Sequence, residues 1–422
     1  MAAVTIDGAT GSLVVNGQKL FPLGLSDPPP LGGTAPGGND AWAEIASAGA
    51  NLIRSGRANW SLQQIDEQIA QERDRMDHAG AHHLLCWPRL AEAAGNLPTT
   101  PNSTQEQLLV RIANGLKDHP ALGAWKGVDE PANPNRPAPV PAAGLVRAYN
   151  RLKQLDPDHP VVITQAPLGP VDDLVRYRPA LDVTGADIYP VGYPPGAHSD
   201  LPNKDISVVG DVTRKMVQAA GSKPVWMTLQ IAWSGVLPRQ SHPGLVPRFP
   251  TLHQERFMAY QAIIDGARGL IFFGGDLTPV MRPRDAQAGW NWTFWTLVLK
   301  PLLIELSSPS VRPALVAPTV GAVRASAGDV EVTARDDGTF LYVIAVRRSG
   351  TLTNRVTISQ LPRRRNGTPI AGGEVVFEYA QSPLPPPTDP TKQAFRPIAV
   401  ANDSFTDWFG PHDTHVYRFR LS

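Results

Sequence analysis

The sequence is poor in several features that mark whole classes of protein. It contains one cysteine, Cys86, in 422 residues, which excludes an intrachain disulfide framework and a cysteine-rich metal site. It has no run of about 18 apolar residues, and its first residues, MAAVTIDGATG, lack the basic and apolar regions of an export signal. We therefore expect no membrane partner. The compartment stays open between cytoplasmic and secreted or periplasmic, because a removed signal peptide leaves no trace.

An excess of charge of either sign is also missing. The chain carries 39 Lys and Arg against 38 Asp and Glu, a net charge of +1. A basic stripe for nucleic acid and an acidic tail are both absent, so we expect no nucleic-acid partner. The composition gives no indication of the oligomeric state.

Short apolar runs of strand length dominate the first three quarters of the chain. Residues 11–25 read as a hairpin around an Asn16-Gly17 turn, since Asn-Gly supplies the positive φ angles of a two-residue turn. Eight runs are expected to form strands: 19–25, 50–54, 82–87, 122–128, 160–165, 181–189, 223–230 and 269–273.

Amphipathic segments with helix signals separate these runs. They cover residues 39–49, 61–80, 103–120, 142–157, 206–221, 253–267 and 291–311. Eight alternations of strand and helix predict a closed (β/α)8 TIM barrel of α/β class. A doubly wound open sheet is the alternative, but SDPPPLGGTAPGG is a poor match to the glycine-rich phosphate loop that normally follows its first strand.

The sequence pattern changes near residue 312, where segments typical of short alternating strands and turns begin. Asp337-Gly338 lies between two such strands and indicates a hairpin. We expect two domains: residues 1–311 form the barrel with its hairpin lead-in, and residues 312–422 form an all-β sandwich of roughly a hundred residues. Residues 380–390, AQSPLPPPTDP, are expected to form a proline-rich loop within it.

In a barrel of this kind, catalytic groups lie at the C-terminal ends of the strands and in the loops that follow. The residues that end the eight runs are Asp27, Arg54, Trp87, Asp129 with Glu130, Gln165, Asp187 with Tyr189, Gln230 and Asp276. The adjacent His82 and His83 are expected to point to opposite faces of a strand, and H-x-H and H-E-x-x-H patterns are absent. A G-x-S-x-G elbow is absent too. A metal-dependent or serine hydrolase is therefore disfavoured, and we expect no metal and no cofactor.

Carboxylates, amides and aromatic rings at a barrel mouth suit glycosidic chemistry. One acid protonates the leaving oxygen, a second carboxylate acts as nucleophile or base, and flat rings stack on sugar faces. The tryptophans near predicted strand ends and loops, among them Trp87 and Trp233, fit such a site. We expect about half of these tryptophans to lie in the core instead.

Several motifs resemble a large clan of (β/α)8 glycoside hydrolases whose acid/base glutamate ends the fourth strand and whose nucleophile ends the seventh. The matching stretches are NLIR (51–54), GVDEP (127–131), GADIYP (185–190), KPVWMTLQ (223–230) and GARGLIFF (266–273). The lead-in LVVNGQKLFPLG and the terminal FTDWFGPHDTHVYRF resemble segments that flank such barrels in bacterial glycosidases. The resemblance implies that Glu130 is the general acid and that the substrate is a carbohydrate.

Two positions depart from that clan. Asp129 replaces the asparagine before the acid/base residue, where it is expected to bond a sugar hydroxyl or to raise the pKa of Glu130. Gln230 occupies the nucleophile position, and an amide cannot be a carboxylate nucleophile. The second carboxylate is then Asp187 or Asp276, and a separation of about 6.5–9.5 Å from the Glu130 carboxyl would predict inversion. Two alternatives remain: Glu255 supplies the second carboxylate, or catalysis has been lost.

The sequence thus predicts a glycosidase with Glu130 and Asp187 as catalytic residues. Asp187 has a competing interpretation as a structural partner for an arginine, and Arg54 is expected to orient a carboxylate. The alternatives are a catalytically inactive carbohydrate-binding protein and a transglycosidase that uses the same site. The residues expected to contact substrate are Asp129, Arg54, Trp87, Tyr189, Gln230, Trp233 and Asp276.

Overall fold

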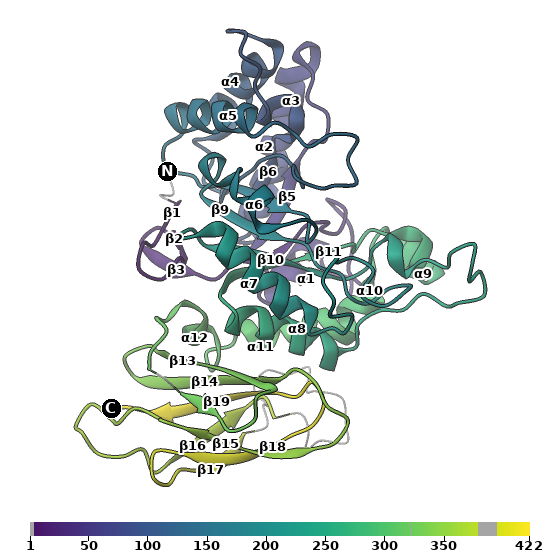
Figure 1. Cartoon of the computed structure of the whole chain (residues 1–422). Helices are drawn as coiled ribbons and strands as arrows, with labels where there is room; N and C mark the ends of the chain where they lie inside the picture. Colours follow the sequence, from purple (N-terminus) through teal and green to yellow (C-terminus); the bar gives the residue numbers. More distant parts are fainter. Residues whose placement is uncertain (1–3, 322, 379–394) are drawn as a thin grey trace. The chain divides into compact units, whose positions relative to one another are not determined.

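The computed structural model describes residues 4–321, 323–378 and 395–422, and its elements are labelled in Figure 1. The predicted loop at residues 380–390 lies outside the described residues. The chain divides into two compact units, one made of Met1–Phe249 and Gly266–Thr293 and the other of Pro250–Asp265 and Phe294–Ser422. The first unit contains every strand of a (β/α)8 barrel, and the second contains a β-sandwich, as the sequence predicts.

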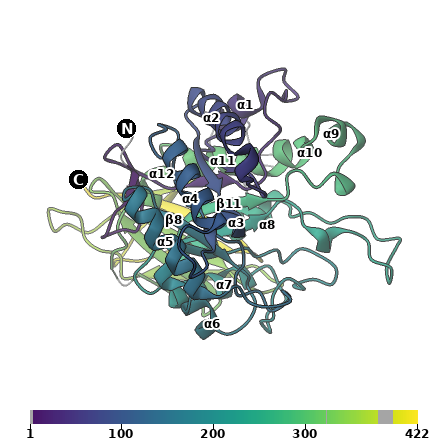
Figure 2. The same ribbon diagram turned by 90° about the horizontal axis from the view of Figure 1, so that it is seen from above.

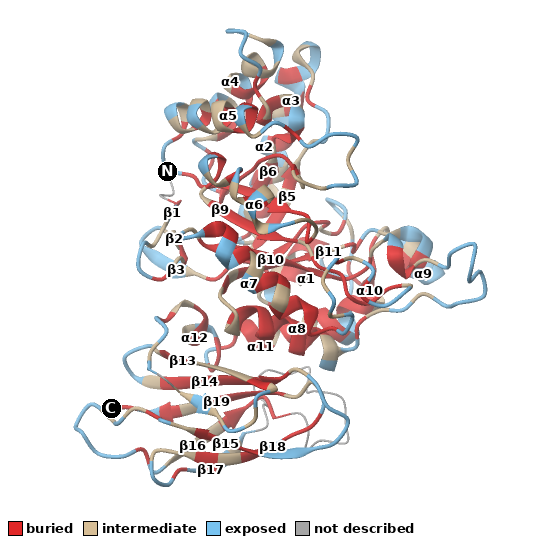
Figure 3. Ribbon diagram, viewed as in Figure 1, coloured by how far each residue is buried: buried red, intermediate tan, exposed pale blue. Residues whose placement is uncertain are grey.

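Eight parallel strands close the barrel in the order β10-β11-β4-β5-β6-β7-β8-β9. Their bounds are β4 Leu23–Leu25, β5 Leu52–Gly56, β6 Leu85–Arg89, β7 Trp125–Lys126, β8 Val161–Gln165, β9 Val183–Ala186, β10 Val225–Gln230 and β11 Ala267–Phe273. All eight predicted runs contribute a strand. The strands are buried along most of their length, as the red ribbon in Figure 3 shows, because helices and side chains cover both faces of a closed parallel sheet.

One strand boundary differs from the prediction in a way that matters for the site. The run 82–87 was expected to end at Trp87, whereas β6 begins at Leu85 and continues to Arg89. His83 has a positive φ of 59°, which a strand residue does not adopt. His82 follows the preceding helix as its C-cap. The expectation that these two histidines lie on opposite faces of a strand is therefore wrong.

Helices follow the strands of the first unit, and Figure 2 shows several of them around β8 and β11. Their bounds are α1 Ala41–Ser47, α2 Ile65–Ala81, α3 Ala91–Gly95, α4 Thr104–Leu116, α5 Ala142–Leu155, α6 Val171–Val175, α7 Val208–Ala220 and α9 Pro283–Ala288. Asp40 caps α1 by accepting hydrogen bonds from the backbone of Trp42 and Ala43. Ser103 caps α4 in the same way through Glu106. None of the helices in the described residues is both long and apolar enough to cross a bilayer.

A three-stranded antiparallel sheet precedes the barrel. It consists of β1 Val4–Ile6, β2 Leu13–Val15 and β3 Gln18–Leu20. Asn16 and Gly17 have φ angles of 51° and 78°, so the predicted tight turn joins β2 to β3. Val4 and Leu13 pack in one apolar cluster with barrel residues that include Leu52, Trp87 and Trp226.

The second unit combines two antiparallel sheets with the remaining helices. One sheet has the order β12-β15-β18 and the other β13-β14-β19-β16-β17. The strands are β12 Arg324–Ala325, β13 Val330–Asp336, β14 Phe340–Arg347, β15 Asn354–Ser359, β16 Gly372–Val376, β17 Arg396–Ala399, β18 Phe405–Phe409 and β19 Thr414–Arg420. Asp337 and Gly338 turn β13 into β14, as predicted.

The helices of the second unit include α8 Leu252–Ile264, α11 Lys300–Ser307 and α12 Arg312–Val316. The predicted single helix over 291–311 is instead α10 Trp292–Phe294, a π-helical turn at Trp295–Leu299, and α11. Pro301 explains the π turn, because it has no N–H to continue the α-helical hydrogen bonds. Helix α8 packs against β13, β14 and β19. The domain boundary at 311/312 remains a prediction.

Candidate active site

Four carboxyl groups of the first unit act on one another at the C-terminal ends of the barrel strands. Asp187 follows β9, Asp129 and Glu130 follow β7, and Asp27 follows β4. All four raise the pKa of Tyr189, after the larger effect of burial. The charges of all four groups therefore act on one buried tyrosine at this end of the barrel.

Glu130 and Asp187 form the tightest pair in the group. Burial and then the charge of Glu130 raise the pKa of Asp187 well above its usual range, with further contributions from Asp129 and from a hydrogen bond to the Glu130 carboxyl. Two carboxyl groups that interact this strongly oppose each other's ionisation. The separation of about 6.5–9.5 Å expected of an inverting pair stays a prediction for Glu130 and Asp187.

Local contacts fix the backbone and the carboxyl group of Glu130. Its N–H donates to the Thr164 carbonyl at 2.8 Å, which attaches the end of β7 to β8. The Asn133 side chain donates to its Oε2 at 2.8 Å. Glu130 has a φ of +43°, a left-handed conformation that costs on the order of 1–3 kcal/mol in a non-glycine residue and is found preferentially at functional sites.

Asp129 is held by a buried lysine. Lys126 Nζ lies 2.5 Å from Asp129 Oδ1 and 5.0 Å from the centre of the Trp87 ring. Burial raises the pKa of Asp129, but the charge and hydrogen bond of Lys126 outweigh it and keep that pKa below its usual value. The Asp129 side chain is 40% exposed, so an ionised oxygen remains open to a ligand. Its charge acts on Asp187, as described above.

Gln230 does not contribute a free amide to the site. It is fully buried, its Oε1 accepts from the Val191 N–H at 2.9 Å, and its Nε2 donates to the Val191 carbonyl at 2.8 Å. Both ends of the amide are thus used by one backbone residue, which positions the loop after β9. We therefore replace the expectation of a substrate contact with a structural role.

An aromatic group lies beside the carboxyl cluster. The Tyr189 ring stacks on Phe273 at 5.2 Å and lies 6.0 Å from Trp233. The His198 ring lies between them, and its centre is 4.3 Å from the centre of the Tyr189 ring and 4.7 Å from that of the Trp233 ring. Burial lowers the pKa of His198 to about 4, so this imidazole is neutral at pH 7. The proline-rich loop YPPGAHSD predicts an exposed histidine at this position, with a place at the barrel mouth as the alternative; the structure instead half-buries His198 against Tyr189.

Trp87 is in the barrel core and not on an exposed surface. It is 2% exposed and lies edge-on to Trp226 at 6.4 Å. A sugar cannot stack on a ring that has no free face. The expected substrate contact by Trp87 therefore becomes a supporting one, beneath Lys126. Trp233 keeps partial exposure, and its indole N–H donates to the Val191 carbonyl at 2.8 Å.

A cavity of about 350 Å³ opens next to Asp27, and neither Glu130 nor Asp187 lines it. Arg54 pairs with Asp27, whose other oxygen accepts from the Gly274 N–H at 3.0 Å. Burial raises the pKa of Asp27, Arg54 opposes the rise, and Asp276 adds to it. Arg54 thus orients a carboxylate, as expected, while Asp276 is exposed at the rim.

Two further arginines line this cavity and were not selected from the sequence. Arg89 ends β6 and lowers the pKa of Asp129, together with Arg54. Arg75 comes from α2. The correct end of β6 would have revealed Arg89, because the candidate residues were chosen at strand ends. Glu255, the alternative second carboxylate, lies on α8 of the second unit and is fully buried there.

Comparisons with known proteins support the fold only. No protein-family model and no curated protein matches the sequence. Among solved structures, the chain is similar to one described as a glycoside hydrolase, with a TM-score of 0.58, 13% identity and coverage of 100% of this chain and 97% of that one. It is also similar to a family 30 endoxylanase from Clostridium papyrosolvens C71, with a TM-score of 0.54, 13% identity and 99% coverage of both chains.

A third similar structure is a family 51 alpha-L-arabinofuranosidase from Bifidobacterium longum. Its TM-score is 0.53 and its identity 11%, with 99% of this chain and 97% of that chain covered. The likeness extends over both the barrel and the C-terminal sheets in each case.

Proposed function

We propose that the protein is a glycoside hydrolase that cleaves a glycosidic bond with Glu130 and Asp187 acting as one proton-carrying pair. The observation that carries the proposal is the position of Glu130 and Asp187 at the C-terminal ends of β7 and β9, where burial and the charge of Glu130 raise the pKa of Asp187 well above its usual range. A carboxylic acid that keeps its proton near neutral pH is the group that glycosidic cleavage requires to protonate a leaving oxygen.

Glu130 delivers the shared proton, and Asp187 is its partner. As the proton moves to the glycosidic oxygen, the bond from that oxygen to the anomeric carbon breaks and the leaving group departs as an alcohol. The pair is left doubly negative, and the positive charge that develops on the sugar ring offsets this charge. A water molecule then adds to the anomeric carbon, and its proton returns to the pair. The ionised, partly exposed Asp129 is placed to accept a hydrogen bond from a sugar hydroxyl or from that water.

The substrate contacts that we propose are those that keep an open polar or aromatic surface. Trp233 supplies a partly exposed ring, Asp129 supplies a carboxylate, and Arg54 and Asp276 line the neighbouring cavity. Tyr189 is buried and packs against Trp233.

Hydrolysis of a panel of aryl glycosides and oligosaccharides tests the proposal. The panel includes xylosides and arabinofuranosides, because two structurally similar proteins are described as an endoxylanase and an arabinofuranosidase. We expect the wild-type protein to cleave at least one substrate and Glu130→Gln to lose about 10²–10⁴-fold in kcat. Asp172→Asn, an exposed acid of α6, should behave as wild type. Full activity of Glu130→Gln would contradict the assignment.

One observation favours a second function, sugar binding without hydrolysis. Gln230 takes the place of the expected nucleophile, and its amide is fully engaged with Val191. A protein that binds members of the panel in calorimetry but cleaves none would be a carbohydrate-binding protein. Chromatography of the products from oligosaccharides would reveal longer chains if the enzyme is instead a transglycosidase.

A further inference from the structure

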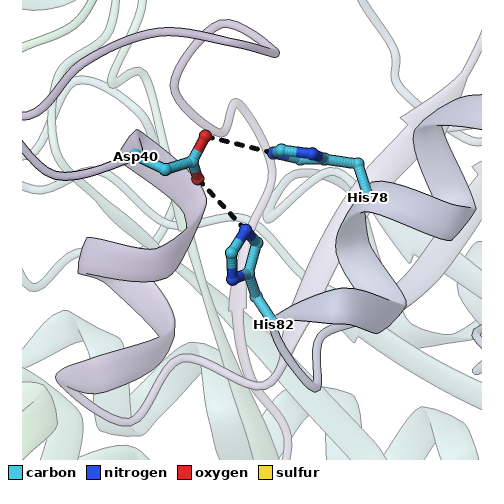
Figure 4. A group of neighbouring side chains, drawn as sticks. All are labelled: Asp40, His78 and His82. Carbon is cyan, nitrogen blue, oxygen red and sulfur yellow. Dashed lines mark ion pairs between the residues drawn. The ribbon is translucent and has the colours of Figure 1, made fainter.

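Three side chains that can bind a metal converge on the outside of the barrel, away from the proposed catalytic pair. Figure 4 shows Asp40 before α1 together with His78 and His82 at the end of α2. The two histidines are four residues apart, the spacing that puts side chains on the same face of a helix. Among the described residues, this is the group of three that could hold a metal ion.

The distances in the cluster match those of a tetrahedral site. His78 Nε2 lies 3.2 Å from Asp40 Oδ2, and His82 Nε2 lies 3.4 Å from Asp40 Oδ1. One ligand atom from each residue lies within 4.8 Å of the others. Zinc bonds to nitrogen and oxygen of about 2.0–2.1 Å give ligand-to-ligand distances of about 3.3–3.4 Å in a tetrahedron. The two nitrogens approach different oxygens of Asp40, so an ion held by a single carboxylate oxygen requires one of these side chains to move.

An ordinary ion pair explains this arrangement less well. His78 Nε2 is buried and, despite lying near Asp40, meets no partner in the described residues with hydrogen-bond geometry. The orientation of Asp40 is set by its capping of α1, since Oδ1 accepts from the N–H groups of Trp42 at 2.8 Å and Ala43 at 3.0 Å. Oδ2 is then left facing His78. A metal ion would satisfy both the imidazole nitrogen and this oxygen.

We propose that Asp40, His78 and His82 bind a divalent transition-metal ion, with zinc as the ion that best suits two imidazoles and one carboxylate. A water molecule would complete the tetrahedron. The ion would join the start of α1 to the end of α2. This proposal is independent of the proposed glycosidase activity, because it uses none of the residues assigned to that reaction.

The site would also stabilise one wall of the cavity next to Asp27. The connection from β4 to α1 supplies Pro28, Pro29 and Leu31 to that wall and ends at Asp40. The Trp42 indole N–H donates to the Pro29 carbonyl at 2.8 Å, and its ring lies 5.2 Å from the His78 ring. Metal binding would therefore fix the connection at its end and, through Trp42, in its middle.

Calorimetric titration of tag-free, chelator-treated protein with Zn²⁺ tests the proposal. We expect one site in the wild-type protein, weakened by about tenfold or more in His78→Ala and in His82→Ala. Asp40→Asn keeps a capping residue and should weaken the site as well. His83→Asn is the matched control, because it changes the adjacent, exposed histidine and asparagine tolerates a positive φ.

A spectroscopic and a thermal measurement keep the result independent of misfolding. Co²⁺ in the wild-type protein should give the strong visible absorption of a tetrahedral site, and Zn²⁺ should raise the midpoint of thermal unfolding. Both effects should be lost in the His78 and His82 variants and kept in His83→Asn. Absence of binding in the wild type would overturn the proposal. Equal binding in all variants would overturn it too, because it would show an adventitious ion only.

Discussion

The residues that surround Tyr189 show how one local environment assigns different protonation states to similar groups. Lys126 lowers the pKa of Asp129, whereas burial and the charge of Glu130 raise the pKa of Asp187. Environments that separate the pKa values of neighbouring carboxyl groups are characteristic of acid and base catalysis. The sequence analysis predicted these acids from their positions at strand ends, but the contact between Glu130 and Asp187 depends on the strand register, which no local pattern contains.

Gln230 provides a test of its structural role. In Gln230→Glu, the carboxylate would face the Val191 carbonyl without the donor that the amide supplies, and it would be buried. We expect the free energy of unfolding in urea to fall by about 3 kcal/mol, with no gain in hydrolysis. Gln218→Glu, an exposed change on α7, should alter stability little. A gain in activity would mean that position 230 faces the substrate after all.

Glu255 makes stability depend on pH. Both of its carboxyl oxygens are buried without a hydrogen-bond partner in the described residues, and burial raises its pKa well above the ordinary value. The folded state then holds a proton that the unfolded state releases, so this contribution is complete below the unfolded pKa and is lost as pH rises. We expect the free energy of unfolding of the wild type to fall, relative to Glu255→Gln, as the pH rises above the ordinary pKa of a glutamate. If the free energies of unfolding of the wild type and of Glu255→Gln change with pH in parallel, this account of Glu255 is wrong.

The elements of the barrel were predictable because each carries its own local signal. Eight apolar runs gave eight strands, Asn16-Gly17 and Asp337-Gly338 gave their turns, and Ser103 caps a helix as expected. The errors arose where tertiary context decides. Pro88 did not end β6, and Pro301 introduced a π turn into what was expected to be one helix. The pair His78 and His82 was visible as an i, i+4 spacing, but it was overlooked because the adjacent histidines were assigned to a strand.

The close approach of β9 and β10 determines where Asp187 lies. A Cβ atom at Gly185 would come within 1.5 Å of the Trp226 carbonyl oxygen, so the two strands would have to separate. We expect Gly185→Ala to reduce the free energy of unfolding by at least about 2 kcal/mol and to impair hydrolysis by moving Asp187. Gly244→Ala, at a position with nothing within 4 Å, is the control. Wild-type stability in both variants would contradict this packing.

At the scale of the whole molecule, the chain does not divide at one point into a barrel and a sandwich. Helix α8 and residues 294–311 belong to the second compact unit. Within that unit, Arg256 of α8 donates to the Thr414 carbonyl at 2.6 Å and bonds both oxygens of Glu305 at 2.9 Å. Arg335 donates to the Ile263 carbonyl at 3.0 Å. The partners of α8 therefore come both from α11 before residue 311 and from the sheet strands beyond it.

Removal of residues 312–422 tests the proposed domain boundary. The truncated chain would expose the surface of α8 that packs against β13, β14 and β19. It would also leave Arg256 without the Thr414 carbonyl and the Ile263 carbonyl without Arg335. We expect this fragment to aggregate or to unfold without cooperativity. A soluble fragment with a cooperative thermal transition at the midpoint of the full chain would show that the boundary at 311/312 separates independent domains.

The central claim is that Glu130 and Asp187 act as one catalytic unit that shares a proton. The most direct test is a double-mutant cycle in kcat on the best glycoside of the panel, with Glu130→Gln, Asp187→Asn and the double variant. Groups that act as a unit give losses that are far from additive. We predict that the double variant loses about as much as either single variant. Losses that multiply, or full activity in either single variant, would contradict the account.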